Sequence, residues 1–332
     1  MTDRIAHGGG ITAAARLHGG RPEDWLDLST GINPNPVPLP DIPVSAWHRL
    51  PDQHLLERAR EAARGYYRSG DILPLPVPGT QSVIQLLPRL APVGSATILS
   101  PTYGEYARAF RLAGLPLNEA TEINDVTDGN DLVVVVNPNN PDGRRLSVDR
   151  LRELHDRLRE HGGILVVDEA FGDMEPECSL APYASLMPNL VIFRSFGKFF
   201  GLAGLRLGFV IAEASILARF EDWLGPWAVS GPALSLAASL MTGDTTTIRN
   251  RILDRRSALD IILRRAKLDA AGGTGLFALV IDERASDIYA HLCRHHILVR
   301  KFDYAPNWLR FGLAPDEEAD RRLAGALEAY SI

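Results

Sequence analysis

Short apolar segments alternate with segments of helical spacing through the first two thirds of this chain. The apolar, mostly β-branched segments predict strands at Thr97–Ser100, Leu132–Val136, Ile164–Val167, Leu190–Phe193 and Leu207–Ile211. Helical spacing marks residues 53–67 and Val148–His161, and the second of these ends at Gly162 and Gly163. Strands this uniformly apolar are buried on both faces. The pattern predicts an α/β fold with a mainly parallel central sheet flanked by helices.

The pattern changes towards both ends of the chain. Residues 1–45 are rich in Gly and Pro and have little periodicity, which predicts an extended N-terminal arm rather than a packed element. Residues 46–235 form the predicted large domain, and residues 236–332 a smaller α+β C-terminal domain. The elements predicted in this C-terminal domain are strands Gly275–Asp282, Ile297–Arg300 and Trp308–Leu313, helix Ser286–His295, and a last helix from Pro315.

Composition narrows the class of protein. A length of 332 residues with 45% hydrophobic and 23% charged residues is ordinary for a soluble protein of two domains. A net charge of −6 argues against a nucleic-acid partner. Cys178 and Cys293 form no CxxC pattern, so we expect neither a disulfide framework nor a metal site. Without a membrane-length apolar run or a signal-peptide pattern, we expect a cytoplasmic protein with no membrane partner.

Lysine is scarce in this chain, and one lysine stands in an unusual place. Lys198 lies within Ser195-Phe-Gly-Lys198-Phe-Phe-Gly, whereas nearly all other basic residues are arginine. At neutral pH arginine neither loses its proton nor forms an imine, and an apolar pocket lowers the pKa of a lysine amine so that it can react with an aldehyde. The segment therefore predicts a reactive amine, the alternative being a surface lysine beside a tight turn.

Two polar motifs lie where ligands bind in open α/β sheets, beyond the carboxyl ends of strands or at helix starts. Pro78-Gly79-Thr80-Gln81-Ser82 opens an apolar helix, where backbone N–H groups and hydroxyls can bind an anion or simply cap the helix. Asn140, after strand Leu132–Val136, can bond a ring hydroxyl, or it can belong to an ordinary turn.

A carboxylate and an arginine complete the set of candidate ligand-binding residues. Asp168 ends a buried strand, where a carboxylate is costly unless a positive group pairs with it. A protonated pyridine nitrogen is one such partner, and a buried arginine is the alternative. Ser195 and Arg206 can return to the same anion as Thr80. Together with the amine of Lys198, these groups match the requirements of an aromatic aldehyde that carries a phosphate.

With these residues, the chain resembles the fold-type I pyridoxal phosphate (PLP) enzymes, the aspartate aminotransferase superfamily, over nearly its whole length. The matching stretches are Asn139-Asn-Pro-Asp-Gly143, Asp168-Glu-Ala-Phe171 and Ser195-Phe-Gly-Lys198, followed by Arg206. The resemblance implies the PLP-dependent transferase fold, with Lys198 bound to the cofactor aldehyde and Asp168 paired with the pyridinium nitrogen. It further implies that Asn140 bonds the ring 3-oxygen and that Tyr103 stacks on the ring. The residues expected at the cofactor phosphate are Thr80, Gln81, Ser195 and Arg206.

Within this superfamily, Ala6-His-Gly-Gly-Gly10 and Ser29-Thr-Gly-Ile-Asn-Pro34 resemble the threonine-phosphate decarboxylases of cobalamin biosynthesis. That resemblance implies a homodimer that decarboxylates L-threonine O-3-phosphate to (R)-1-aminopropan-2-yl phosphate. Arg310 would clamp the substrate carboxylate. The implied substrate-binding residues are His7, Gly8, Gly9, Asn33, Arg300 and Arg310, of which the first four would lie on an N-terminal arm, residues 1–45, covering the active site. The alternatives are an aminotransferase of histidinol-phosphate type and a PLP-binding protein without catalysis.

Three positions depart from the family pattern. Phe171 replaces a tyrosine that bonds the ring 3-oxygen, and Asp142 replaces a threonine. Leu50 replaces a tyrosine whose hydroxyl reaches the cofactor phosphate of the neighbouring subunit. This last departure weakens one phosphate contact and one argument for a dimer with shared sites.

Overall fold

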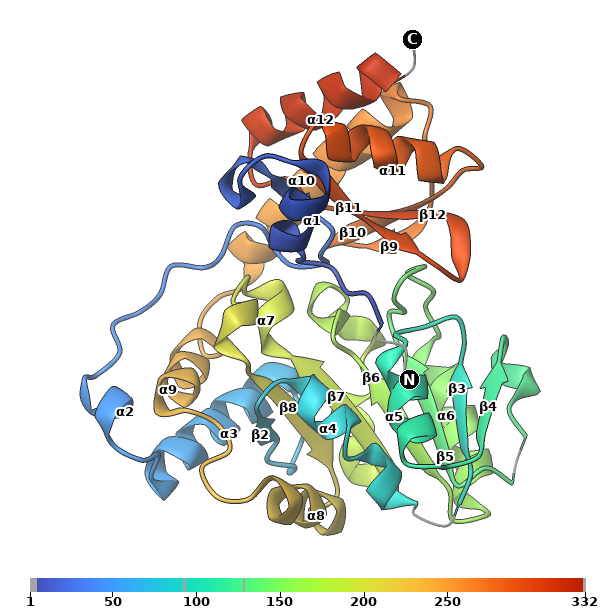
Figure 1. The fold of residues 1–332 in the computed structure, drawn as a ribbon. Coiled ribbons are helices and arrows are strands. Elements are labelled where there is room, and N and C mark those ends of the chain that lie inside the picture. Colours follow the sequence, from blue (N-terminus) through green and yellow to red (C-terminus); the bar gives the residue numbers. More distant parts are fainter. Residues whose placement is uncertain (1–4, 92–93, 128, 331–332) are drawn as a thin grey trace. The chain divides into compact units, whose positions relative to one another are not determined.

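The computed structural model describes residues 5–91, 94–127 and 129–330, and the chain forms two compact units (Figure 1). Unit 1 comprises Met1–Pro36, Pro141–Arg144 and Thr246–Ile332, and unit 2 comprises Val37–Asn140 and Arg145–Thr245. These divisions differ from the predicted boundaries at residues 45 and 235. Residues 1–4 of the predicted arm lie outside the described residues.

The centre of unit 2 is a sheet in which parallel strands dominate. Its order is β2 (Leu75–Val77), β8 (Gly208–Ala212), β7 (Leu190–Ser195), β6 (Ile164–Asp168), β5 (Leu132–Val136), β3 (Ala96–Leu99) and β4 (Leu117–Ala120). The strands from β4 to β7 run parallel, whereas β8 is antiparallel to both β7 and β2. The predicted mainly parallel sheet is confirmed, and its parallel carboxyl ends meet at one edge.

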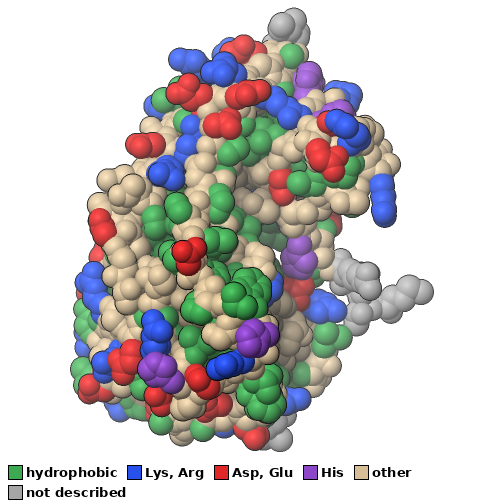
Figure 2. Space-filling model, turned by 90° about the vertical axis from the view of Figure 1, so that its left-hand side faces the viewer, with side chains coloured by type: hydrophobic (Ala, Val, Ile, Leu, Met, Phe, Trp, Pro, Cys, Tyr) green, Lys and Arg blue, Asp and Glu red, His purple; other side chains and the backbone are tan. Residues whose placement is uncertain are grey.

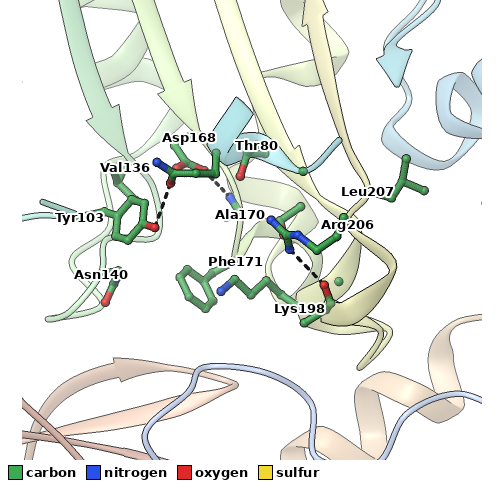
Figure 3. A pocket seen from close by; sticks show the side chains of 15 residues that line it. Thr80, Tyr103, Val136, Asn140, Asp168, Ala170, Phe171, Lys198, Arg206 and Leu207 are labelled. Atoms are coloured by element: carbon green, nitrogen blue, oxygen red, sulfur yellow. Dashed lines mark hydrogen bonds between the residues drawn. The ribbon is translucent and has the colours of Figure 1, made fainter. Parts of the chain in front are cut away.

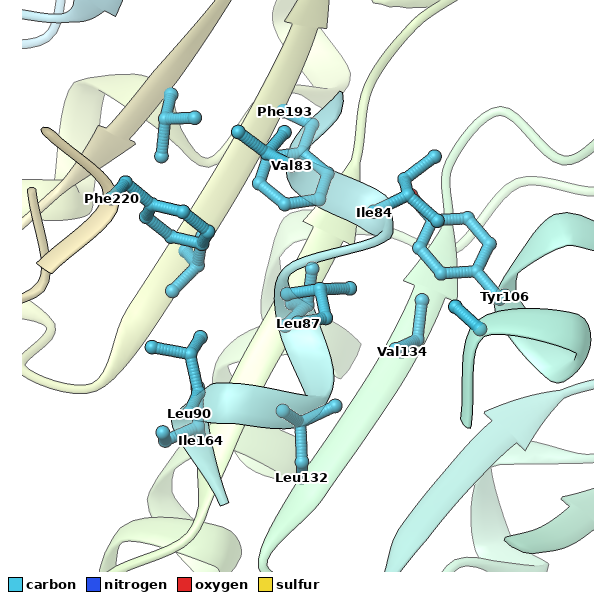
Figure 4. Close-up of a cluster of buried hydrophobic side chains, with 14 of the residues drawn as sticks. Val83, Ile84, Leu87, Leu90, Tyr106, Leu132, Val134, Ile164, Phe193 and Phe220 are labelled. Carbon is cyan, nitrogen blue, oxygen red and sulfur yellow. The ribbon is translucent and has the colours of Figure 1, made fainter. Parts of the chain in front are cut away.

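Helices cover this sheet and enclose an apolar core (Figures 1 and 4). The helices of unit 2 are α2 (Ser45–His48), α3 (Gln53–Tyr67), α4 (Thr80–Ile84), α5 (Glu105–Leu112), α6 (Val148–Arg159), α7 (Phe196–Phe199), α8 (Ala214–Leu224) and α9 (Gly231–Leu240). In α6 the Ser147 hydroxyl caps the first turn by accepting from the Arg150 amide, and the leucines of one face are buried. In the core, Val83 and Leu87 pack with Phe193 and Phe220.

Unit 1 contains a smaller sheet of order β1 (Leu26–Leu28), β11 (Ile297–Phe302), β12 (Ala305–Gly312), β10 (Phe277–Ile281) and β9 (Ala270–Thr274). Its helices are α1 (Ile11–His18), α10 (Thr246–Arg265), α11 (Ala285–Arg294) and α12 (Glu317–Tyr330). Short 3₁₀ turns in the two units occur at Pro22–Asp24, Leu87–Leu90, Ile123–Asp125, Gly172–Met174, Pro176–Cys178, Ala181–Leu186 and Ala203–Leu205. Across the described ranges, every helix is too short or too polar to cross a membrane.

The N-terminal segment is more ordered than an extended arm. Residues 11–18 form α1, and β1 pairs in parallel with β11. Ala14, Ala15 and Trp25 pack against Cys293 and Leu298, which lie far away in the sequence. The Gly- and Pro-rich composition does not show these elements because C-terminal residues supply the apolar surface that stabilises them.

Candidate active site

A pocket of about 200 Å³ lies in unit 2, at the edge of the sheet where β5, β6 and β7 end (Figure 3). It is lined by the eight residues that the sequence analysis assigned to the cofactor: Thr80, Gln81, Tyr103, Asn140, Asp168, Ser195, Lys198 and Arg206. Gly79, Val136, Ala170, Phe171, Gly197, Ala203 and Leu207 complete the lining. The structure thus brings the predicted set together, and the role of each residue stays a prediction.

Asp168 is the buried carboxylate of this pocket. Its Oδ2 accepts a hydrogen bond of 2.7 Å from the Tyr106 hydroxyl, and its Oδ1 accepts one of 2.9 Å from the Ala170 amide. Burial raises the pKa of Asp168, although both hydrogen bonds and the charge of Lys198 act in the opposite direction. The ionised carboxylate is therefore incompletely compensated, and a protonated ring nitrogen is a suitable partner. Sequence reasoning missed Tyr106.

Lys198 lies in α7, the short helix that follows β7 directly. Its Nζ lies 5.4 Å from the centroid of the Phe171 ring, and its neighbours Phe196 and Phe199 are wholly buried. A Cβ at Gly197 would lie 2.6 Å from the Ala203 Cα, so this glycine allows α7 to pack closely on the following turn. The amine is thus presented in a partly apolar wall of the pocket, beside Phe171 (Figure 3).

The start of α4 and the guanidinium of Arg206 form the donor-rich end of the pocket. Gly79 has a φ of +73°, and a Cβ on it would lie 2.7 Å from Arg206 Nη2. The missing side chain leaves space for the guanidinium, whose Nη1 donates to the Ala203 carbonyl. With the hydroxyls of Thr80 and Ser195, this is the donor set that a phosphate group needs, so the residues present fit PLP.

Hydrogen bonds hold the aromatic wall of the pocket. The Tyr103 hydroxyl donates to Gln81 Oε1 over 3.0 Å, and Gln81 Nε2 donates to Glu105 Oε2 over 3.0 Å. Asn139 Nδ2 donates to the Pro101 carbonyl, and Asn139 Oδ1 accepts from the Thr102 hydroxyl. The loop that carries Asn140 is thus joined to the loop that carries Tyr103.

The six predicted substrate-binding residues belong to unit 1, and several of them meet at Ser29. The Gly9 amide donates to Ser29 Oγ, and Arg310 Nη2 donates to the Ser29 carbonyl, each over 2.8 Å. A Cβ at Gly8 would lie 2.4 Å from the same carbonyl oxygen. Burial and the charge of Arg300 lower the pKa of Arg310 to about 10.

The remaining predicted substrate-binding residues of unit 1 are Arg300, Asn33 and His7. Arg300 is the register partner of Arg310 and donates to the Ala6 carbonyl. Asn33 is buried, and its side chain accepts from the Asn35 amide, whereas His7 is exposed. Two arginines and a loop with close backbone packing are therefore gathered in this unit, which suits a ligand with more than one negative group.

A model of the family described as aminotransferase class I and II matches residues 24–327. The chain belongs to this family. A threonine-phosphate decarboxylase of Sinorhizobium sp is 60% identical over 333 residues, with 100% of both chains covered. A threonine-phosphate decarboxylase of Pseudomonas aeruginosa is 43% identical, with 98% of each covered.

Solved structures of low sequence identity share the fold. The histidinol-phosphate aminotransferase of Sinorhizobium meliloti, solved in complex with pyridoxal-5'-phosphate, has a TM-score of 0.80 at 20% identity, covering 97% of this chain and 94% of that one. The L-threonine-O-3-phosphate decarboxylase of Porphyromonas gingivalis has a TM-score of 0.73 at 18% identity, covering 91% and 98%. Family membership confirms the predicted PLP-dependent transferase fold and the predicted cofactor, PLP.

Proposed function

We propose that this chain decarboxylates L-threonine O-3-phosphate to (R)-1-aminopropan-2-yl phosphate, a reaction of the aminopropanol arm of cobalamin synthesis. The observation that carries this proposal is the 60% identity, over the full length of both chains, to a relative named threonine-phosphate decarboxylase. The relatives named histidinol-phosphate aminotransferase are more distant; that of Aeromonas hydrophila is 28% identical.

The residues of the pocket have distinct roles in this proposal. Bound PLP supplies an electron sink for the electron pair left at Cα when carbon dioxide departs. Asp168 would keep the ring nitrogen protonated, and Lys198 would hold the cofactor aldehyde and act as the general acid that returns a proton to Cα. Asn140 would bond the ring 3-oxygen and Tyr103 would stack on the ring. The cofactor phosphate would be held by Thr80, Gln81, Ser195 and Arg206.

Unit 1 supplies the groups that recognise the substrate in this proposal. L-threonine O-3-phosphate carries a carboxylate and a phosphate, and Arg300 and Arg310 are two cations from adjacent strands. Because burial penalises the charge of Arg310, an anionic ligand is the favourable partner for it. His7, Gly8, Gly9 and Asn33 complete the substrate-binding set.

The test is an assay of the purified holoenzyme with L-threonine O-3-phosphate and no keto-acid acceptor. Release of carbon dioxide together with the phosphorylated amine supports the proposal. Accumulation of pyridoxamine phosphate, with amino transfer to a keto acid, supports the aminotransferase alternative instead. A protein that binds PLP and gives neither result is the non-catalytic alternative.

We further propose that the protein is a cytoplasmic homodimer. An exposed apolar surface supports the dimer: Val44 is 75% exposed, Trp47 67%, Leu50 65% and Trp227 59%. Figure 2 shows hydrophobic side chains gathered on the face that carries α2. Apolar surface of this kind marks contact sites in proteins.

The dimer is tested by analytical sedimentation, which should give twice the mass of the chain. Trp47→Arg should lower the measured mass towards that of the monomer. A wild-type monomer would overturn this part of the proposal.

A further inference from the structure

A buried tyrosine connects the apolar core of unit 2 to the carboxylate of Asp168. Tyr106 lies in α5 and is wholly buried, with its ring in the core beside Ile84 and Val134 (Figure 4). Its hydroxyl donates to Asp168 Oδ2 over 2.7 Å. A side chain confined in this way has little rotational freedom, so packing fixes the position of its hydroxyl.

The hydrogen bond from Tyr106 favours the ionised form of Asp168. Burial opposes ionisation by raising the pKa of this carboxyl, and the Tyr106 hydroxyl is the strongest of the groups that lower it again. Burial also raises the pKa of Tyr106 well above its usual value, so the hydroxyl remains a donor. The Ala170 amide supplies a second hydrogen bond, from the backbone.

We propose that Tyr106 is a positioning residue for the cofactor: its hydroxyl holds Asp168 as an oriented anion that can pair with the protonated ring nitrogen of PLP. This inference rests on the PLP binding that the proposed function requires. Without the hydroxyl, the buried carboxyl can take up a proton or rotate. A neutral Asp168 offers no charge to the ring nitrogen, and the nitrogen then loses its own proton.

The test compares two ligands on apoprotein carrying Tyr106→Phe. One ligand is PLP, and the other is 1-deazapyridoxal 5'-phosphate, in which a carbon replaces the ring nitrogen. Since hydrogen bonds to charged groups contribute about 1.5–3 kcal/mol, we expect the Kd for PLP to rise roughly tenfold to hundredfold. The Kd for the deaza analogue should stay the same within about a factor of two, because no ring nitrogen pairs with Asp168. Equal weakening of both ligands, or of neither, would overturn the proposal.

A matched variant separates this effect from the general loss of a buried hydroxyl. Tyr289, in unit 1, is a half-buried tyrosine of α11, and Tyr289→Phe should leave the ratio of the two Kd values at its wild-type value. If Tyr106→Phe does not fold, 3-fluorotyrosine at position 106 keeps the ring and makes the hydroxyl a stronger donor. This substitution should lower the Kd for PLP and leave the Kd for the deaza analogue unchanged. Equal changes in the two Kd values would again reject the proposal.

A double substitution tests whether Tyr106 affects PLP binding through Asp168. In an Asp168→Asn background, adding Tyr106→Phe should change the Kd for PLP by less than it does in the wild type, because the charge it supports has gone. The binding measurements use no substrate. A protein that binds PLP as expected but leaves L-threonine O-3-phosphate unchanged would disprove the proposed reaction and leave this inference standing.

Discussion

Arg300 and Arg310 are register partners on the adjacent antiparallel strands β11 and β12, so two guanidinium side chains start from the same face of one sheet. Like charges directly opposite each other destabilise a strand pair. Arg310 is also buried, and its burial together with the charge of Arg300 lowers its pKa to about 10, below the ordinary value of an arginine. The arrangement is costly in the absence of an anion.

We therefore expect Arg300→Gln to stabilise the apoprotein while weakening substrate binding. Relief of the like-charge pair should raise the free energy of unfolding by roughly 0.5 kcal/mol, and loss of one cation should raise the KM for L-threonine O-3-phosphate at least about tenfold. Urea unfolding and steady-state kinetics measure the two effects. An unfolding free energy that falls, with KM unchanged, would contradict this account.

The same pair gives a pH prediction. Because the pKa of Arg310 is lowered to about 10 in the folded protein, the folded state releases this proton at a lower pH than the unfolded chain does. From about pH 10 upwards the unfolded state therefore binds more protons, so this group's contribution to the free energy of unfolding rises with pH while affinity for anions falls. In Arg300→Gln the loss of inorganic phosphate binding should move to higher pH, as titration calorimetry on either side of pH 10 would show.

Replacement of Lys198 should remove both covalent attachment and proton transfer. In Lys198→Ala, borohydride should no longer fix PLP to the protein, and the decarboxylation rate should fall by roughly 10²–10⁴ or more. Mass spectrometry of the reduced protein measures the first effect. Lys267→Asn is the matched control: Lys267 has a φ of 57°, which asparagine tolerates, and this variant should still gain the cofactor mass. Cofactor mass on Lys198→Ala would place the attachment elsewhere.

Replacing Gly79 by alanine, which adds only a methyl group, should already be unfavourable. Alanine there must adopt a φ of +73° and place a Cβ 2.7 Å from Arg206 Nη2, so the guanidinium has to move. We expect Gly79→Ala to weaken PLP binding about tenfold and to cost about 1 kcal/mol of stability from the backbone alone. Gly65→Ala provides a contrast of opposite sign. Apart from its chain neighbours and the backbone of its own helix, no heavy atom of the described residues lies within 4 Å of a Cβ there, and this change inside α3 should stabilise the protein by about 0.5–1 kcal/mol. Fluorescence titration and urea unfolding would test both variants.

A buried ionic cluster behind the catalytic segments should matter for folding. Arg194 donates to Glu169 over 2.7 Å and to Asp173 over 2.8 Å, and all three side chains are buried. Arg194→Met removes the counter-charge of both buried carboxylates, so we expect the free energy of unfolding to fall by about 3–5 kcal/mol. The exposed Arg111 pairs with Glu119, and Arg111→Met should cost less than about 1 kcal/mol. Similar losses in both variants would refute this ranking.

Much of the cofactor pocket could be predicted because chemistry-bearing residues follow buried strands. Asp168 closes β6, and Ser195 closes β7 just before Lys198. Parallel strands bring their carboxyl ends to one edge, so residues far apart in sequence, such as Thr80 and Arg206, could be assigned to one pocket. The apolar runs of these strands also fixed their bounds to within a few residues.

Other features depend on contacts that the local sequence does not contain. β1, β2 and β4 are short and include aspartate, proline, or asparagine with glutamate, so no apolar run marks them. Tyr103 and Tyr106 are three residues apart, with Tyr103 in the loop before α5 and Tyr106 in the first turn of this helix. Their spacing does not reveal that one lines the pocket while the other reaches Asp168 from the core; that follows only from how α5 packs on the sheet.

The pairing of β1 with β11 has a consequence for synthesis. Residues 26–28 leave the ribosome long before residues 297–299, their partners in the sheet. Unit 1 is therefore incomplete until translation is nearly finished, whereas every strand of the large sheet has already been made by residue 212. A nascent chain that stalls between these points carries an edge strand without its neighbour, which makes it a target for chaperones and proteases.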